Sequence, residues 1–211
     1  MMGFLRTITT STLGKYTHGG GALSEEEHRF YEVNGYIIRK NNVSDALLDE
    51  IGTRFVDICN GKIDVGMEIR LVKDASLKQK VVKGVNSVRK VQDCLHDDIF
   101  SKYVSDPAVT DIVTSIIGPN ITAIHCMLLN KPLDANPNSS MDPLHQDLHG
   151  FPFRPPERIV ASWTALENVD KDNGGLYMVP GTHTLELQPH DYFEWLRKSV
   201  SCHYADSNCL M

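Results

Sequence analysis

The periodicity of apolar residues changes at Asn120, and this change constrains the fold more than any other feature of the sequence. Before that point, apolar residues recur at every third or fourth position over residues 44–59 and 108–117, which predicts two amphipathic helices. After it, short apolar or alternating stretches bounded by Pro, Gly and Asn predict strands. These expected strands cover residues 121–129, 158–166, 175–179 and 199–204. Helices followed by strands favour an α+β fold, with the helices packed against an antiparallel barrel or sandwich.

The N-terminal region carries clear signals for one further helix. Ser24, with Glu27 three residues later, forms a capping-box pattern that predicts a helix over residues 25–33, ended by Asn34-Gly35. The apolar residues 36–38 predict a short strand. Residues 1–22 end in three glycines and predict a flexible leader, so we expect a leader followed by one domain over residues 23–211.

Composition excludes several classes of protein. The net charge of −6 offers no basic stripe for nucleic acid, and no apolar run approaches the roughly 20 residues that span a bilayer. The five cysteines form neither a C-x-x-C pair nor a zinc spacing, and an odd number leaves at least one unpaired, so we expect reduced thiols. The sequence does not set the oligomeric state.

The segment that carries chemistry is Pro143-Leu144-His145-Gln146-Asp147-Leu148-His149. If it is a strand, the side chains of His145 and Asp147 project from the same face. An imidazole and a carboxylate placed in this way are two members of the 2-His-1-carboxylate triad that holds non-haem Fe(II). An H-x-D pattern also arises by chance on protein surfaces, so its context decides between the two readings. His149 is interpreted as close to the substrate or packed, and not as a ligand.

That context resembles the phytanoyl-CoA hydroxylase (phytanoyl-CoA dioxygenase) family. The H-x-D segment is followed by an aromatic and proline-rich turn, a Trp-bearing strand and the pattern N-G-x-L-x-x-x-P-G-T-H, in HQDLHGFPFRPPERIVASWTALENVDKDNGGLYMVPGTH. Upstream, FYEVNGYIIRKN, KVQD and GPNITAIHCMLLNKP also match in order and spacing. The resemblance covers residues 24–195.

The resemblance implies a double-stranded β-helix (jelly-roll, cupin-like) fold with flanking N-terminal helices. It implies an Fe(II)- and 2-oxoglutarate-dependent, ascorbate-supported 2-hydroxylation of a branched fatty acyl-CoA with O2, in the peroxisome. His145 and Asp147 match the first two iron ligands. The positions that match the 2-oxoglutarate pocket are Lys90, Met127, Trp163 and Arg197. Taken alone, Met127 and Trp163 would be read as core residues and Lys90 as a surface charge.

The sequence departs from the family pattern after Trp195. The family continues for several dozen residues that include the distal iron-binding histidine, whereas here Leu196-Arg197-Lys198 follows at once and resembles the family's next strand. We therefore expect an internal deletion at the 195/196 junction, no third iron ligand and an incomplete barrel. His183, His190 and His203 are not expected to replace the missing ligand. His203 in particular, six residues beyond Arg197, is expected about 20 Å along the strand.

Three functions stay open at this point. The chain is an impaired isoform of a phytanoyl-CoA-type hydroxylase, a catalytically silent splice product that acts as a binding or interaction module, or a cupin-like small-molecule binder without redox chemistry. The last is disfavoured because such a binder has no need of Lys90, Met127, Trp163 and Arg197 together.

Overall fold

A computed structural model of the chain describes residues 14–74, 77, 82–130, 144–170, 175–188 and 199–210. The helices in these residues are α1 (Glu25–Asn34), α2 (Asp45–Cys59), α3 (Phe100–Val104) and α4 (Pro107–Ile117). The strands are β1 (Arg70–Lys73), β2 (Val88–Gln92), β3 (Ile121–Leu129), β4 (Ile159–Ala165) and β5 (Ser199–Asp206). None of the described helices is both long and apolar enough to cross a membrane.

Helices α1, α2 and α4 begin within one residue of their predicted starts. At α1 the Ser24 side chain accepts a hydrogen bond from the Glu27 backbone N–H, and the Glu27 carboxylate accepts one from Ser24 N–H, which confirms the capping box. Gly35 ends α1 in the left-handed conformation, with φ of 79°. Ser44 caps α2 and Asp106 caps α4, and both helices bury the apolar side that their spacing predicted.

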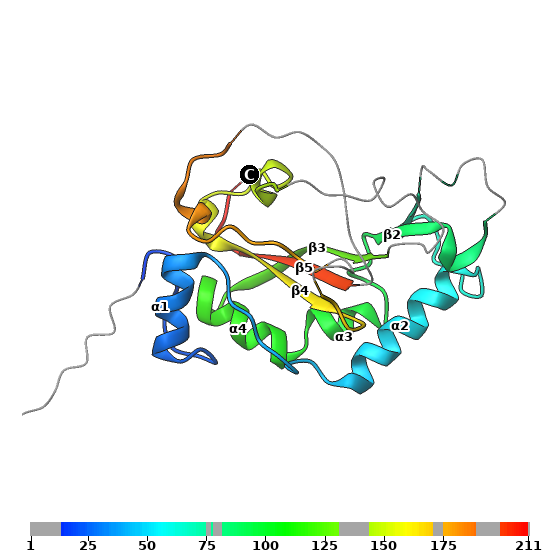
Figure 1. Cartoon of the computed structure of the whole chain (residues 1–211), viewed down its shortest axis with the longest axis horizontal. Coiled ribbons are helices and arrows are strands. Elements are labelled where there is room, and N and C mark those ends of the chain that lie inside the picture. Colours follow the sequence, from blue (N-terminus) through cyan, green and yellow to red (C-terminus); the bar gives the residue numbers. More distant parts are fainter. Residues whose placement is uncertain are drawn as a thin grey trace, which may run out of the picture.

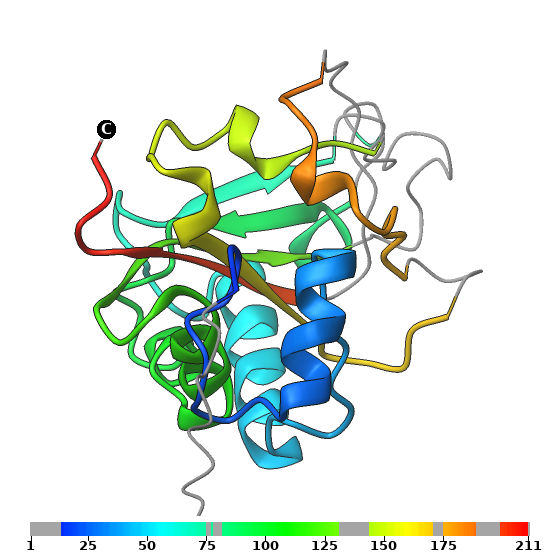
Figure 2. The same cartoon turned by 90° about the vertical axis from the view of Figure 1, so that its left-hand side faces the viewer.

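One antiparallel sheet joins the five strands in the order β1-β2-β3-β5-β4. The strand β5, last in the chain, lies between β3 and β4 (Figure 1). Helices α2, α3 and α4 cover one side of the sheet, while residues 144–158 and 175–188 lie on the other side (Figures 1 and 2). The predicted α+β jelly-roll class is confirmed. In the described residues the sheet does not close into a barrel.

The core forms between the sheet and these helices. Its large, fully buried side chains include Phe55, Phe100, Tyr103, Ile117, Leu128, Val200 and Tyr204. Two tyrosines within it keep their hydroxyls satisfied: Tyr103 contacts the hydroxyls of Ser162 and Thr164 on β4, and Tyr204 donates to the carbonyl of Val104. Removing these apolar side chains from water is the main contribution to the stability of the fold.

Several local expectations were wrong. Residues 36–38 and 175–179 form no strand, because apolar character alone does not supply a neighbouring strand with free N–H and C=O groups. Strands β1 and β2 and the short helix α3 were missed, since each is too short to show a clear period. The 195/196 junction lies outside the described residues.

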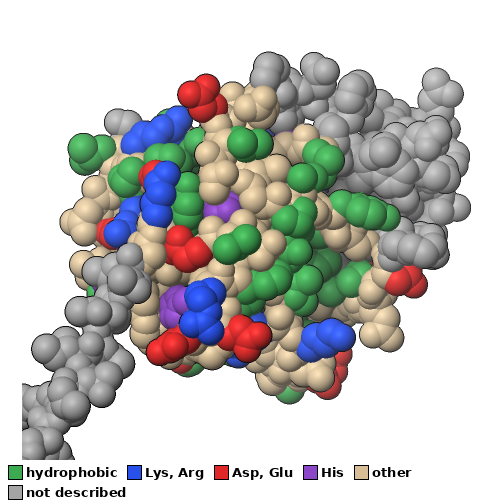
Figure 3. Space-filling model, turned by 60° about the vertical axis from the view of Figure 1, so that its left-hand side comes forward, with side chains coloured by type: hydrophobic (Ala, Val, Ile, Leu, Met, Phe, Trp, Pro, Cys, Tyr) green, Lys and Arg blue, Asp and Glu red, His purple; other side chains and the backbone are tan. Residues whose placement is uncertain are grey.

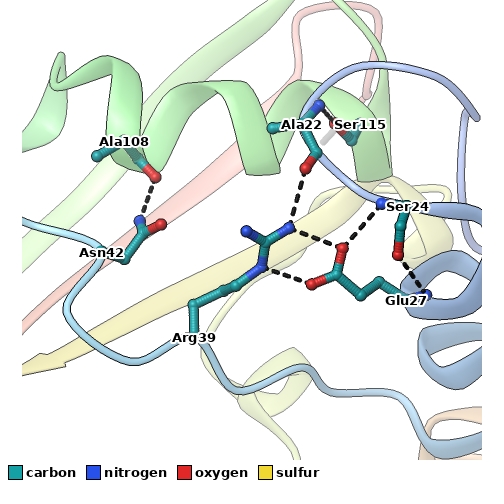
Figure 4. Close-up of polar contacts among 7 residues, drawn as sticks. All are labelled: Ala22, Ser24, Glu27, Arg39, Asn42, Ala108 and Ser115. Atoms are coloured by element: carbon teal, nitrogen blue, oxygen red, sulfur yellow. Dashed lines mark hydrogen bonds and ion pairs between the residues drawn. The ribbon is translucent and has the colours of Figure 1, made fainter.

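The described part of the predicted leader, residues 14–22, is held by hydrogen bonds. Glu32 of α1 accepts from the backbone N–H of Tyr16 and from the hydroxyl of Thr17. Ser115 of α4 accepts from Ala22 N–H, and Arg39 joins the Ala22 carbonyl to the Glu27 carboxylate (Figure 4). The expectation of a flexible leader does not account for these contacts.

Candidate functional site

Strand register places three of the predicted cofactor residues on one face of the sheet. Met127 on β3 faces Ser201 on β5, and Ser201 faces Trp163 on β4. Side chains of facing residues point to the same side of a sheet, so Met127, Ser201 and Trp163 form a row across it. Lys90 on β2 faces Leu129, two positions from Met127, and therefore belongs to the same side. We call this side the site face.

The opposite side, which we call the helix face, carries the neighbouring residues of the same strands. Cys126, Leu128, Val200 and Cys202 are fully buried there. Since Tyr103 of α3 reaches Ser162 on the helix face, this is the side against which the helices pack. The site face is therefore the side covered by residues 144–158 and 175–188 (Figure 2).

His145 and Asp147 lie next to each other, as predicted, but not on a strand. His145 Nε2 is 3.1 Å from Asp147 Oδ1, and the side chains are 39% and 48% exposed. Asp147 begins a single 3-10 turn, Asp147–His149, in which its carbonyl accepts the Gly150 N–H. The strand prediction for 145–147 was thus wrong, because the turn and not strand geometry brings the imidazole and the carboxylate together.

A second imidazole contacts the same carboxylate. His203 Nε2 lies 3.0 Å from Asp147 Oδ2, and its side chain is 5% exposed. His203 faces His125 on β3 and Ala161 on β4, so it projects from the site face. The contact with Asp147 was not predicted, because Asp147 is 56 residues away in the chain and no local pattern relates the two positions.

The two imidazoles control the ionisation of Asp147. Its partial burial by itself would raise the pKa of the carboxyl group, but the hydrogen bonds from His145 and His203 outweigh this effect and hold the pKa well below its usual value. Burial lowers the pKa of His125, and the neighbouring His203 lowers it further. The site therefore presents an anionic carboxylate beside a neutral His125.

Buried polar atoms without a hydrogen-bond partner gather on the site face. Among the described residues they include Trp163 Nε1, Ser199 Oγ, His125 Nδ1 and His203 Nδ1. Because such atoms are rarely left unpaired in folded proteins, they indicate a surface that is suited to a polar ligand.

The other histidines considered from sequence have different positions. His149 Nε2 contacts the carbonyl of Gln188, and His183 Nε2 contacts the carbonyl of Glu32 in α1. His183 thus ties the 3-10 turn Thr182–Thr184 to the N-terminal helix, as a loop-ordering residue does. His190 and Arg197 lie outside the described residues.

Comparison with known proteins identifies the family. A profile of the phytanoyl-CoA dioxygenase family (PhyH) matches residues 31–207. The chain belongs to the phytanoyl-CoA dioxygenase family. It is 35% identical to the peroxisomal phytanoyl-CoA dioxygenase of Bos taurus over 244 residues, covering 92% of this chain and 72% of that protein. It is 39% identical to the Homo sapiens protein over 182 residues, covering 86% of this chain and 54% of that protein.

Length is a clear difference from these relatives. The chain spans about half of the Homo sapiens protein and 59% of a probable phytanoyl-CoA dioxygenase of Caenorhabditis elegans, to which it is 41% identical over 184 residues, 85% of this chain. The alignment with the Bos taurus protein extends over 244 residues, more than the 211 of this chain, so part of that stretch has no counterpart here.

Solved structures support the fold. The crystal structure of EctD from S. alaskensis with bound Fe aligns with a TM-score of 0.65 at 12% identity, covering 92% of this chain and 82% of that one. The non-haem α-ketoglutarate-dependent epimerase SnoN from nogalamycin biosynthesis aligns with a TM-score of 0.64 at 16% identity, covering 88% and 81%. At these identities the likeness establishes the jelly-roll fold alone.

The residues present fit a divalent iron in part. Neighbouring ligands of an octahedral ion with bonds of about 2.1 Å lie about 3 Å apart, which matches the 3.1 Å between His145 Nε2 and Asp147 Oδ1. Imidazole and carboxylate are also the donors of the 2-His-1-carboxylate class. Within the described ranges, no three His, Cys, Asp or Glu side chains are arranged as a ready metal site. A third donor would have to come from elsewhere.

Proposed function

We propose that this chain derives from an Fe(II)- and 2-oxoglutarate-dependent dioxygenase that hydroxylates carbon 2 of a 3-methyl-branched fatty acyl-CoA. The observation that carries the proposal is the His145–Asp147 pair, with its donor atoms 3.1 Å apart beside the site face. The names of the relatives support the acyl-CoA substrate and the peroxisomal location. Ascorbate, which keeps iron reduced, belongs to the same proposal.

Each residue has a defined task in this proposal. His145 and Asp147 bind iron, which together with 2-oxoglutarate supplies the redox chemistry for activating dioxygen. The Lys90 ammonium suits a dicarboxylate, and Met127 and Trp163 form apolar walls that exclude water around its methylene groups. The unpartnered indole N–H of Trp163 can donate to a bound carboxylate. Arg197 is proposed to pair with the far carboxylate of 2-oxoglutarate.

We propose further that the chain of 211 residues is an impaired form. The family pattern breaks at Trp195-Leu196, and the Bos taurus alignment is longer than this chain. Both support an internal deletion that removes the distal histidine. With two protein donors instead of three, Fe(II) should bind weakly, and metal binding cannot add the stabilisation that a complete site provides.

A turnover assay tests both statements. The 211-residue chain is expected to show no measurable decarboxylation of 2-oxoglutarate with Fe(II) and ascorbate, while a form with the block between residues 195 and 196 restored should be active. His145→Ala in the restored form should abolish turnover, and His96→Ala, an exposed histidine, should leave it unchanged. Turnover by the 211-residue chain at the restored rate would contradict the impairment. It would also require His183, His190 or His203 as a ligand.

The second candidate is a catalytically silent chain that binds the complete enzyme. Among the described residues β4 pairs only with β5, so its other edge is open. Large apolar side chains are exposed nearby in sequence, at Leu176, Tyr177, Met178, Val179, Leu185 and Leu187. Figure 3 shows hydrophobic side chains gathered on one face of the molecule. Open edges and apolar patches favour association. The 211-residue chain and the complete enzyme are mixed and separated by size-exclusion chromatography with light scattering, which would detect a complex. Elution of the two proteins in separate peaks would exclude this role.

A further inference from the structure

The carboxylate of Asp147 has two oxygens, and the structure gives each one a different histidine. His145 Nε2 lies 3.1 Å from Oδ1, and His203 Nε2 lies 3.0 Å from Oδ2. The proposed iron position is beside Oδ1 and His145. His203 therefore contacts the oxygen on the other side of the carboxylate.

Exposure separates the two histidines in the same way. The side chains of His145 and Asp147 are 39% and 48% exposed, whereas that of His203 is 5% exposed. His203 thus lies beneath Asp147, toward the sheet, and a metal ion that arrives from solvent meets His145 and Asp147 first. A side chain that hydrogen-bonds a ligating carboxylate from its buried side can support that ligand without binding the metal itself.

The ring of His203 is fixed by its surroundings. It packs against Phe151, with ring centroids 4.5 Å apart, and the ring centroid of His125 on β3 is 5.7 Å away. The backbone of His203 belongs to β5, which is paired on both sides, by β3 and β4. Packing and pairing together hold Nε2 in one direction, toward Oδ2.

The hydrogen bond identifies the donor atom. An anionic carboxylate only accepts hydrogen bonds, so Nε2 must carry the proton that it shares with Asp147. The other ring nitrogen, Nδ1, is buried without a partner among the described residues. The contact with Asp147 is thus the one polar interaction of the His203 side chain within the described part of the chain. An apolar residue at this position would bury no unpaired nitrogen.

We infer that His203 is a positioning residue that orients the Asp147 carboxylate so that Oδ1 faces the metal ion together with His145. Outer residues that hydrogen-bond a ligating carboxylate fix its direction, and their loss typically weakens metal affinity about 10- to 100-fold. The inference rests on the proposed iron pair and deepens it.

Metal binding by the 211-residue chain tests the inference without turnover. Co(II) is titrated calorimetrically and by its visible absorption into the wild type, His203→Ala, His203→Gln, His145→Ala and His96→Ala. We expect His203→Ala to bind about 10- to 100-fold more weakly. His203→Gln should recover most of the affinity, because the glutamine amide nitrogen can also donate to Oδ2. His145→Ala should abolish binding at the site, and His96→Ala, an exposed histidine beside acidic residues, should bind as the wild type does.

Two results would overturn the role of His203 alone. Wild-type affinity in His203→Ala would show that Asp147 needs no support. Affinity as low in both His203 variants as in His145→Ala, with a changed cobalt spectrum, would make His203 a direct ligand. Equal binding by the wild type and His145→Ala would instead refute the iron pair and the inference with it. Nitrogen-15 NMR of the imidazoles tests the hydrogen bond without metal: an unprotonated Nε2 in His203 would exclude donation to Asp147.

Discussion

The helix face and the site face of the sheet are built from alternate residues of the same strands, yet they differ in chemistry. On the helix face, the Tyr103 hydroxyl contacts the hydroxyls of Ser162 and Thr164. On the site face, Trp163, Ser199 and His203 keep buried polar atoms that have no partner in the part of the chain that the structure describes. The two faces therefore differ in how their buried polar groups are paired, and successive side chains of a strand alternate between them.

The largest expected effect separates binding from folding at His145. We predict that His145→Ala removes Co(II) or Fe(II) binding at the site but changes the free energy of unfolding by less than about 0.5 kcal/mol, because the side chain is 39% exposed. Calorimetric metal titration and urea denaturation measure the two quantities. A large loss of stability in this variant would contradict the division between the faces.

Two neighbouring residues of β3 allow a direct comparison of the faces. Leu128 is fully buried on the helix face, so Leu128→Ala should lower the free energy of unfolding by about 2–5 kcal/mol. Met127 is only partly buried on the site face, so Met127→Ala should lower the free energy of unfolding by about half as much. Urea denaturation of both variants provides the measurement. Equal losses would mean that both faces contribute the same packing.

A buried charge on the helix side should be fully paired, and Asp97 tests this rule. Its carboxylate accepts hydrogen bonds from Arg54 at 3.0 and 2.7 Å and from the backbone N–H groups of Ile99 and Phe100. We predict that Asp97→Asn lowers the free energy of unfolding by about 2–3 kcal/mol at pH 7. Asp98→Asn, an exposed neighbour, is the matched control.

The same residue predicts a dependence on pH. Burial by itself would raise the pKa of Asp97, but the Arg54 and backbone hydrogen bonds outweigh it, so the pKa in the folded protein is lowered. The stabilisation is therefore present above the unfolded pKa of about 3.9 and is lost as pH falls through the lower folded value. The difference in urea midpoint between the wild type and Asp97→Asn should shrink between pH 7 and pH 3. A constant difference would exclude this linkage.

The smallest effect is expected at α1, which has no fully buried residue and depends on polar contacts. Ser24→Ala should lower the free energy of unfolding by about 1 kcal/mol, since it removes one half of the capping box. Ser24→Asn, which preserves a capping side chain, should retain most of the stability in thermal denaturation. A loss as large as that of Leu128→Ala would show that α1 contributes to the core.

Sequence predicted the elements whose signals are local. The apolar spacing of α2 and α4 and the capping box of α1 depend on neighbours within four residues, and each helix was found near its observed bounds. Strand β3 was predicted with its observed bounds, because its nine residues are bounded by Asn120 and Asn130. The short β1 and β2 offer too few residues for a period and were missed.

The candidate site was predicted in part, for a related reason. His145 and Asp147 are two residues apart, so a strand and the observed turn both bring their side chains together, and the wrong strand prediction still paired them. The contact between Asp147 and His203 joins positions 56 residues apart and depends on the register of β5 between two other strands. Local patterns carry no information about that register. Only the assembled sheet defines it.

The position of β5 also has a consequence for the order in which the protein folds. Strands β3 and β4 leave the ribosome before β5, yet each uses one full edge to pair with it. Until β5 is synthesised, the edges of β3 and β4 that it will join lack their partner. Pairing β5 with them requires contacts between residues that are far apart in the chain, such as Cys126 and Cys202. Contacts of this kind slow folding and prolong the exposure of unpaired edges. Among the described strands, the centre of the sheet therefore forms only after both of its flanking strands have been made.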